Sequence, residues 1–223
     1  MEEVRGSSPL RSTAYYADIY MIFNFGEIEG DPLMEKIDLR DIGMFAKQWD
    51  HPMKGLFKYA KSMRKHGGDI HNIPKKDREH YCVSLVALAF TEGSYLEWWT
   101  HMLTNDPPDG VVITFKEEFT GEYKGYMREV EVVEHRDSSD SIFTTIKKKM
   151  TEYSYKPNTI LVCLILFSAI YDFKRLADQL SKINSSLKHI FVIFAGISLC
   201  NDIPSAKEIQ TIYTMVQLLP VFE

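Results

Sequence analysis

Cysteine is scarce in this chain, and its spacing argues against both disulfides and structural zinc. Cys82, Cys163 and Cys200 are far apart and odd in number. A metal-binding cysteine pair needs short spacing. Two of the three lie in strongly apolar runs, where buried reduced thiols are the usual outcome. We therefore expect a reducing compartment, cytoplasmic by default.

Long hydrophobic runs are also missing. The most apolar stretch, Thr159 to Ile170, holds about a dozen residues, whereas a membrane-spanning helix needs roughly 20. We interpret it as a buried strand. Residues 1–13 are polar and lack the apolar core of a secretory signal, so we interpret them as a mobile leader. No membrane partner is expected.

Several catalytic signatures are absent. Gly196 stands alone, so there is no glycine-rich phosphate loop. A nucleophile elbow of the G-x-S-x-G type is absent, and the seven histidines lack zinc-like spacing. Clustered carboxylates remain as the main chemical candidates.

Basic residues are concentrated in one segment of a chain whose net charge is −5. Two interpretations stay open: a solvated helix face, and a surface that contacts a phosphate backbone. The candidate nucleic-acid-binding residues are Lys58, Lys61, Arg64, Lys65, Lys75 and Lys76.

Apolar periodicity predicts a three-layer α/β core with a central mixed sheet flanked by helices. We assign residues 14–74 to a mainly helical N-terminal extension and residues 75–223 to the core. The expected helices cover about 33–49, 53–64, 74–103 (interrupted near 92–94), 141–153 and a segment from 172, and a segment from 206 to 216 is helical or a strand. The expected strands cover about 15–25, the hairpin within 109–134, 159–167, 190–199 and a short edge at 217–222.

The stretch Asn105 to His135 carries an unusual concentration of acid. It is predicted to be a turn, a strand, a hairpin turn and a second strand. Glu129 and Glu131 lie two apart and project from one strand face, with Asp109 at the start of the neighbouring strand. Such a face is favoured either by full solvation or by a bound cation.

This pattern resembles the PD-(D/E)XK nuclease superfamily. Pro108-Asp109, about twenty residues, then Glu129-Val130-Glu131, a helix and two apolar strands follow the order of that family. The resemblance covers about Glu79 to Phe194. It implies a restriction-endonuclease-like fold and Mg²⁺- or Mn²⁺-dependent hydrolysis of phosphodiester bonds in nucleic acid, with DNA as the favoured substrate.

Carried over by position, Asp109 matches the first aspartate and Glu129 the (D/E) position. Glu131 stands where the family usually has lysine. Lys147, Lys148 or Lys149 on the next helix offers a relocated lysine, and we take Lys147 as the representative. Glu97 or Glu92 is the candidate helix acid. The resemblance therefore implies catalytic Asp109, Glu129, Glu131 and Lys147, with metal at Asp109, Glu129 and Glu97.

Two other interpretations remain open from the residues. The nuclease-like core could be inactive and serve as a module that binds nucleic acid or a protein partner, which the missing motif lysine favours. Alternatively, the acidic hairpin is only a solvated edge. The sequence also leaves homodimer formation open, as well as the choice between DNA and RNA.

Overall fold

A computed structural model describes residues 35–37, 49–94, 96–104, 107–117, 121, 123–137, 139–167, 172–187, 189–198 and 210–217. The predicted leader at 1–13 and the predicted strands at 15–25 and 217–222 lie outside the described residues, apart from Gln217. The described helices are α3 (Pro52–Lys65), η2 (Ile70–Asn72), α4 (Lys75–Ser94), α5 (Ile142–Glu152) and α6 (Phe173–Leu180). The strands are β1 (Glu35–Ile37), β2 (Trp98–Met102), β3 (Gly110–Glu117), β4 (Tyr123–His135), β5 (Ile160–Ile165), β6 (His189–Ser198) and β7 (Gln210–Gln217).

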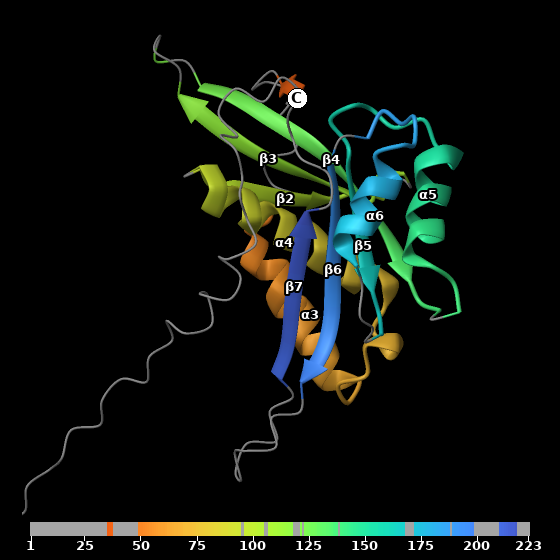
Figure 1. The fold of residues 1–223 in the computed structure, drawn as a ribbon. Helices are drawn as coiled ribbons and strands as arrows, with labels where there is room; N and C mark the ends of the chain where they lie inside the picture. The colour runs from red at the N-terminus through yellow and green to blue at the C-terminus, as the bar shows by residue number, and fades with distance from the viewer. Residues whose placement is uncertain are drawn as a thin grey trace, which may run out of the picture.

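The strands form one mixed sheet in the order β2-β3-β4-β5-β6-β7 (Figure 1). β2, β3 and β4 are antiparallel neighbours, whereas β4, β5 and β6 run parallel to one another. β7 is antiparallel to β6. β1 pairs with the first half of β4, and β5 pairs with the second half. The two parallel connections pass through α5 and α6, as crossovers between parallel strands require.

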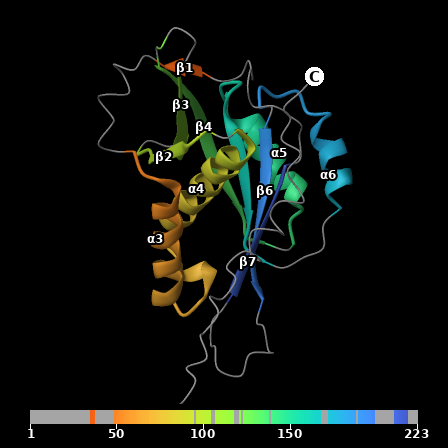
Figure 2. The same cartoon turned by 90° about the vertical axis from the view of Figure 1, so that its left-hand side faces the viewer.

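Helices cover both faces of the sheet, which gives three layers (Figure 2). On one face, α3 and α4 share a hydrophobic cluster with even-numbered residues of β4 and β5, such as Val130 and Val162. On the other face, α5 and α6 pack on odd-numbered residues of β5, such as Leu161 and Cys163. The alternation follows from the two-residue period of a strand. The α/β class and the mixed sheet predicted from the sequence are confirmed.

α4 is the most deeply buried helix of the described part. Residues 78–84 are all buried because α4 lies between α3 and the sheet. Gly55 allows α3 to come close: a Cβ at that position would lie 2.1 Å from Ser84 Oγ. The predicted burial of α4 around much of its circumference is confirmed.

Two predicted helical segments are wrong. Residues 98–102 form strand β2 rather than the end of a helix, and residues 35–37 form β1 inside a segment predicted to be helical. In the first case, Trp98 and Trp99 pair with Thr114 and Ile113 of β3. Aromatic residues are favoured in β-strands. The pairing with β3 therefore outweighed the approximate helical spacing of the apolar residues in this segment.

Two of the three cysteines lie within the described residues, and the interpretation of buried reduced thiols is confirmed for both. Cys82 and Cys163 are fully buried and free. Burial raises the pKa of each thiol. No helix among the described residues is both long enough and apolar enough to cross a bilayer.

Candidate carboxylate site

Asp109 stands immediately before β3 and is almost completely buried, with 1% of its surface exposed. Its Oδ2 accepts a hydrogen bond of 2.9 Å from Val132 N on β4. Its backbone oxygen accepts one of 3.0 Å from Leu103 N. These contacts fix the start of β3 between the end of β2 and the middle of β4, and the Val132 N–H holds the carboxylate against β4.

Glu131 occupies the neighbouring position on β4. Gly110 pairs with Val130, so Asp109 and Glu131 lie at the same level of the β3–β4 register. Glu131 is fully buried, and its Oε1 lies 2.6 Å from Lys149 Nζ of α5. The hairpin and the following crossover helix thus bring two acids and one base together.

Glu79 of α4 supplies a third buried carboxylate. Its oxygens lie 2.9 Å from Lys75 Nζ and 2.9 Å from Lys76 Nζ. Lys76 Nζ is also 3.7 Å from Asp109 Oδ1. The first two turns of α4 therefore place both an acid and a cation at the start of β3. We call Glu79, Asp109, Glu131 and Lys149 the carboxylate site.

Burial and neighbouring charges shift the pKa values of three groups in or beside this site. Burial raises its pKa to about 7, the hydrogen bond from Val132 opposes the rise, and the charges of Glu131 and Glu79 add to it. Burial also acts to raise the pKa of Glu79, but the ammonium groups of Lys75 and Lys76 outweigh it and hold that pKa below its usual value. Contact with Glu79 in turn raises the pKa of Lys76. Perturbed groups of this kind gather at functional sites.

The structure separates the acids that the sequence grouped together. Glu129 shares a strand face with Glu131, but its carboxylate contacts Lys156 at 2.8 Å and the Thr159 hydroxyl at 3.1 Å. Glu97 is exposed and lies 3.8 Å from His51. Glu79, not Glu97 or Glu92, is the helix acid that lies near Asp109.

The predicted lysines are separated as well. Lys147 is exposed, and its Nζ lies 5.7 Å from the centre of the Phe143 ring. Lys149, two residues later, is the lysine that reaches Glu131. Of the predicted nucleic-acid-binding residues, Lys75 and Lys76 contact Glu79, and Lys58 pairs with Asp77 at 2.9 Å. The other three, Lys61, Arg64 and Lys65, are exposed on α3.

Sequence reasoning missed Glu79 and gave Lys149 only as one of three alternatives, although both residues carried a readable signal. Glu79 lies on the same helical stripe as Val83, Val86 and Phe90, all of which are buried. Lys149 falls on the apolar stripe of Ile142 and Ile146, at positions i+7 and i+3. A charged residue inside an apolar stripe must point toward the core, whereas Lys147 lies outside the stripe.

The donor chemistry of the site suits a hard divalent cation, because it offers only carboxylate oxygens. Asp109 Oδ1 is buried and accepts no hydrogen bond in the described structure. However, no three histidine, cysteine, aspartate or glutamate side chains of the described residues are already arranged to hold a metal ion. The ammonium groups of Lys76 and Lys149 contact these carboxylates instead, so a metal would have to draw the acids closer together.

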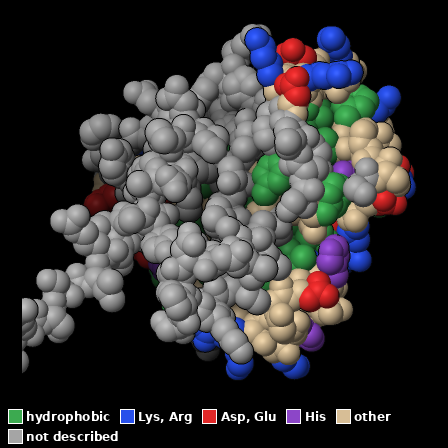
Figure 3. Space-filling model, turned by 60° about the horizontal axis from the view of Figure 1, so that its bottom comes forward, with side chains coloured by type: hydrophobic (Ala, Val, Ile, Leu, Met, Phe, Trp, Pro, Cys, Tyr) green, Lys and Arg blue, Asp and Glu red, His purple; other side chains and the backbone are tan. Residues whose placement is uncertain are grey.

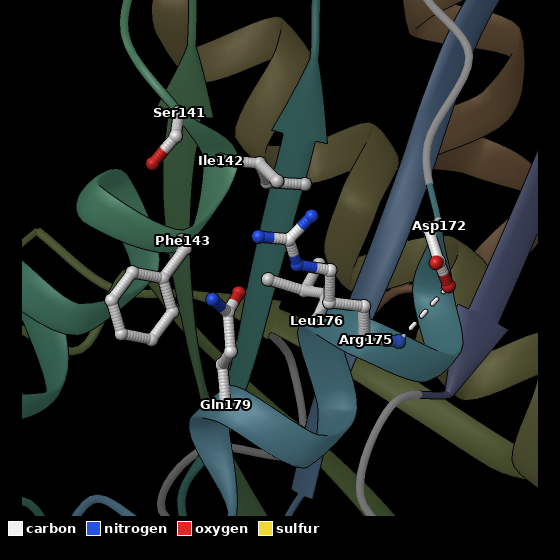
Figure 4. A pocket seen from close by; sticks show the side chains of 7 residues that line it. All are labelled: Ser141, Ile142, Phe143, Asp172, Arg175, Leu176 and Gln179. Carbon is white, nitrogen blue, oxygen red and sulfur yellow. Dashed lines mark hydrogen bonds between the residues drawn. The ribbon is translucent and has the colours of Figure 1, made fainter.

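A separate pocket of about 340 Å³ opens between α5 and α6 (Figure 4). Phe143, Leu176 and Gln179 line it, and Arg175 extends across it. Asp172, its single acid, caps α6 by accepting a hydrogen bond of 3.0 Å from Arg175 N. The pocket contains none of the acids of the carboxylate site.

Comparison with protein-family models, curated proteins and solved structures gave no match. The functional argument therefore depends on the geometry of this chain.

Proposed function

We propose that this protein is a divalent-metal-dependent nuclease with a restriction-endonuclease-like core. The convergence of Glu79 of α4, Asp109 at the start of β3, Glu131 of β4 and Lys149 of α5 carries the proposal. The order α4-β2-β3-β4-α5-β5 supports the same assignment. In this interpretation Glu131, not Glu129, takes the (D/E) position of the PD-(D/E)XK pattern. Val133 then stands at the lysine position, and Lys149 supplies the cation from α5.

The proposed chemistry is hydrolysis of a phosphodiester bond, favoured in DNA. Asp109, Glu131 and Glu79 would hold Mg²⁺ or Mn²⁺, which would neutralise phosphate charge and lower the pKa of a bound water. Lys149 would position the attacking water and balance the charge of Glu131. Lys76 would leave Asp109 and contact the phosphate, because its side chain is 54% exposed.

The test is cleavage of duplex DNA in Mg²⁺ or Mn²⁺. Asp109→Asn, Glu131→Gln and Lys149→Met are each expected to lower the rate by about 10²-fold or more, the usual scale for a group that acts on the reacting atoms. Lys147→Met is the control for Lys149→Met, because both lysines lie on α5. Glu97→Gln is the control for the acid variants, because it changes an exposed carboxylate outside the site. Both control variants should retain activity. Full activity in Asp109→Asn would remove the site from the mechanism.

One observation favours a second function, an inactive nuclease-like module that binds nucleic acid or a protein partner. Lys75, Lys76 and Lys149 already pair with the buried acids, so the site has internal cations. Calorimetric titration with Mn²⁺ separates the two functions. Binding that raises the melting temperature and is lost in Asp109→Asn supports the nuclease, whereas no binding supports the inactive module.

A further inference from the structure

The outer face of α3 carries a row of five exposed cations. Its exposed residues are Lys54, Phe57, Lys58, Lys61, Arg64 and Lys65, together with Ala60. The helix contains no acidic residue, although the chain as a whole has a net charge of −5. We propose that this row, here called the α3 basic face, binds the phosphate backbone of duplex DNA outside the carboxylate site. The choice of DNA depends on the proposed function.

Three of the five cations have no internal role in charge pairing. Lys54 pairs with Asp50 at 2.6 Å, and Lys58 pairs with Asp77. In the part of the chain that the structure describes, no acid forms an ion pair with the other three, Lys61, Arg64 and Lys65. Their charges are therefore available to replace the counterions of a polyanion, which is the main source of affinity for nucleic acid.

The spacing of the face suits a stiff duplex. From Lys54 to Lys65 the helix advances about 16 Å at about 1.5 Å per residue, the length of roughly five base pairs at about 3.4 Å each. The inner side of α3 is fixed, because Tyr59 and Met63 are buried and Gly55 packs against α4. A rigid row of cations loses little conformational entropy when it meets a regular row of phosphates.

The face also leads toward the carboxylate site. α3 and α4 run antiparallel (Figure 2), and the Lys58–Asp77 ion pair joins the middle of α3 to the first turn of α4. That turn holds Lys75 and Lys76, whose ammonium groups contact Glu79. Figure 3 shows Lys and Arg side chains mainly around the rim of the described surface, with hydrophobic side chains nearer its middle. A duplex lying on α3 would thus reach the proposed site at one end.

The experiment measures binding without cleavage. The full chain is titrated with a fluorescent DNA duplex in EDTA at several salt concentrations. The triple variant Lys61→Gln, Arg64→Gln, Lys65→Gln is compared with Lys174→Gln, Arg175→Gln, Lys182→Gln, which removes three exposed cations from the opposite side of the sheet. We expect the affinity of the α3 variant for the duplex to be lower than that of the wild type by a factor on the order of ten or greater. Its salt slope should fall by about 2 to 3, close to 0.9 for each lost phosphate contact. The control variant with substitutions at Lys174, Arg175 and Lys182 should bind like the wild type.

Equal affinity and equal slope in the α3 variant and the wild type would overturn the proposal, and so would equal losses in the two triple variants. An RNA duplex that binds more tightly, with the same loss in the α3 variant, would overturn the assignment to DNA. Because the assay needs no metal, a chain that binds through α3 but never cleaves would refute the nuclease and leave the basic face standing. A chain that cleaves with unchanged binding in the α3 variant would do the reverse.

Discussion

At the residue scale, Asp109 is a buried acid that lies next to two other buried acids. Its carboxyl is buried, receives one hydrogen bond from Val132 N, and lies near Glu79 and Glu131. An acid in this setting is more stable protonated, and its pKa of about 7 expresses that preference. A bound cation would offset the negative charge of these clustered carboxylates, so Asp109 is suited to be a cation ligand.

We expect Asp109 to make the fold less stable as the pH rises from about 4 to about 7. Its pKa is raised in the folded state, so over this window the folded chain holds a proton that the unfolded chain has released. The lowered pKa of Glu79 acts in the opposite direction. Urea unfolding in EDTA should therefore show Asp109→Asn gaining about 1 to 3 kcal/mol relative to wild type between pH 4 and pH 8.

Glu97→Gln is the control for this measurement, because Glu97 is an exposed carboxylate outside the site. It should leave the pH dependence of unfolding unchanged. A difference between Asp109→Asn and wild type that is the same at pH 4 and pH 8 would contradict the assignment of a raised pKa to Asp109.

At the scale of elements, the close packing of α3 on α4 sets the position of the first turn of α4 relative to α3. A Cβ on Gly55 would lie 2.1 Å from Ser84 Oγ and 2.8 Å from His80 Cδ2. Glycine is therefore needed because of the neighbouring helix, since α3 has ordinary helical geometry there. Close packing at this point keeps Lys58 within reach of Asp77.

Gly55→Ala is expected to destabilise the fold by about 1 to 3 kcal/mol, because the added methyl group overpacks the contact. On an exposed helix the same change would stabilise by up to about 1 kcal/mol. Chemical unfolding distinguishes the two signs. The double variant Gly55→Ala, Ser84→Ala should recover part of the loss, because it removes the nearest atom. A Gly55→Ala variant more stable than wild type would contradict the described packing.

At the scale of the whole molecule, Arg78 joins the α3–α4 layer to the sheet. It is buried and donates two hydrogen bonds to the Glu134 carboxylate, at 2.6 and 3.0 Å. It also donates to the backbone oxygens of Ile70 and Ile73. One guanidinium therefore ties α4, β4 and the η2 turn together next to the carboxylate site.

Arg78→Met is expected to destabilise the fold by about 3 to 5 kcal/mol, because the buried Glu134 carboxylate loses its guanidinium partner and the Ile73 backbone oxygen loses the Arg78 donor. Arg136→Gln is a close control. Arg136 also contacts Glu134 but is 56% exposed, so its loss should cost about 1 kcal/mol or less. Equal losses in the two variants, measured by urea unfolding, would contradict a special role for the buried arginine.

Local residue patterns were sufficient to predict the α/β class and most of the elements. Alternation along β4, the apolar runs of β5 and β6, and the stripe of α5 follow from local periodicity, which the chain carries in its residue order. The same alternation placed Glu129 and Glu131 on one strand face. The position of Asp109 at the start of a predicted strand also identified it as a candidate site residue.

Which of these acids lie close together depends on tertiary packing. The β3–β4 register places Asp109 opposite Glu131, whereas the Glu129 carboxylate contacts Lys156 and Thr159. The antiparallel return through β2 brought Glu79 to Asp109 across thirty residues, although Glu92 and Glu97 are nearer in the chain. Similarly, β2 replaced a predicted helix because Trp98 and Trp99 found partners on β3. Distances between elements depend on packing, and no local pattern encodes them.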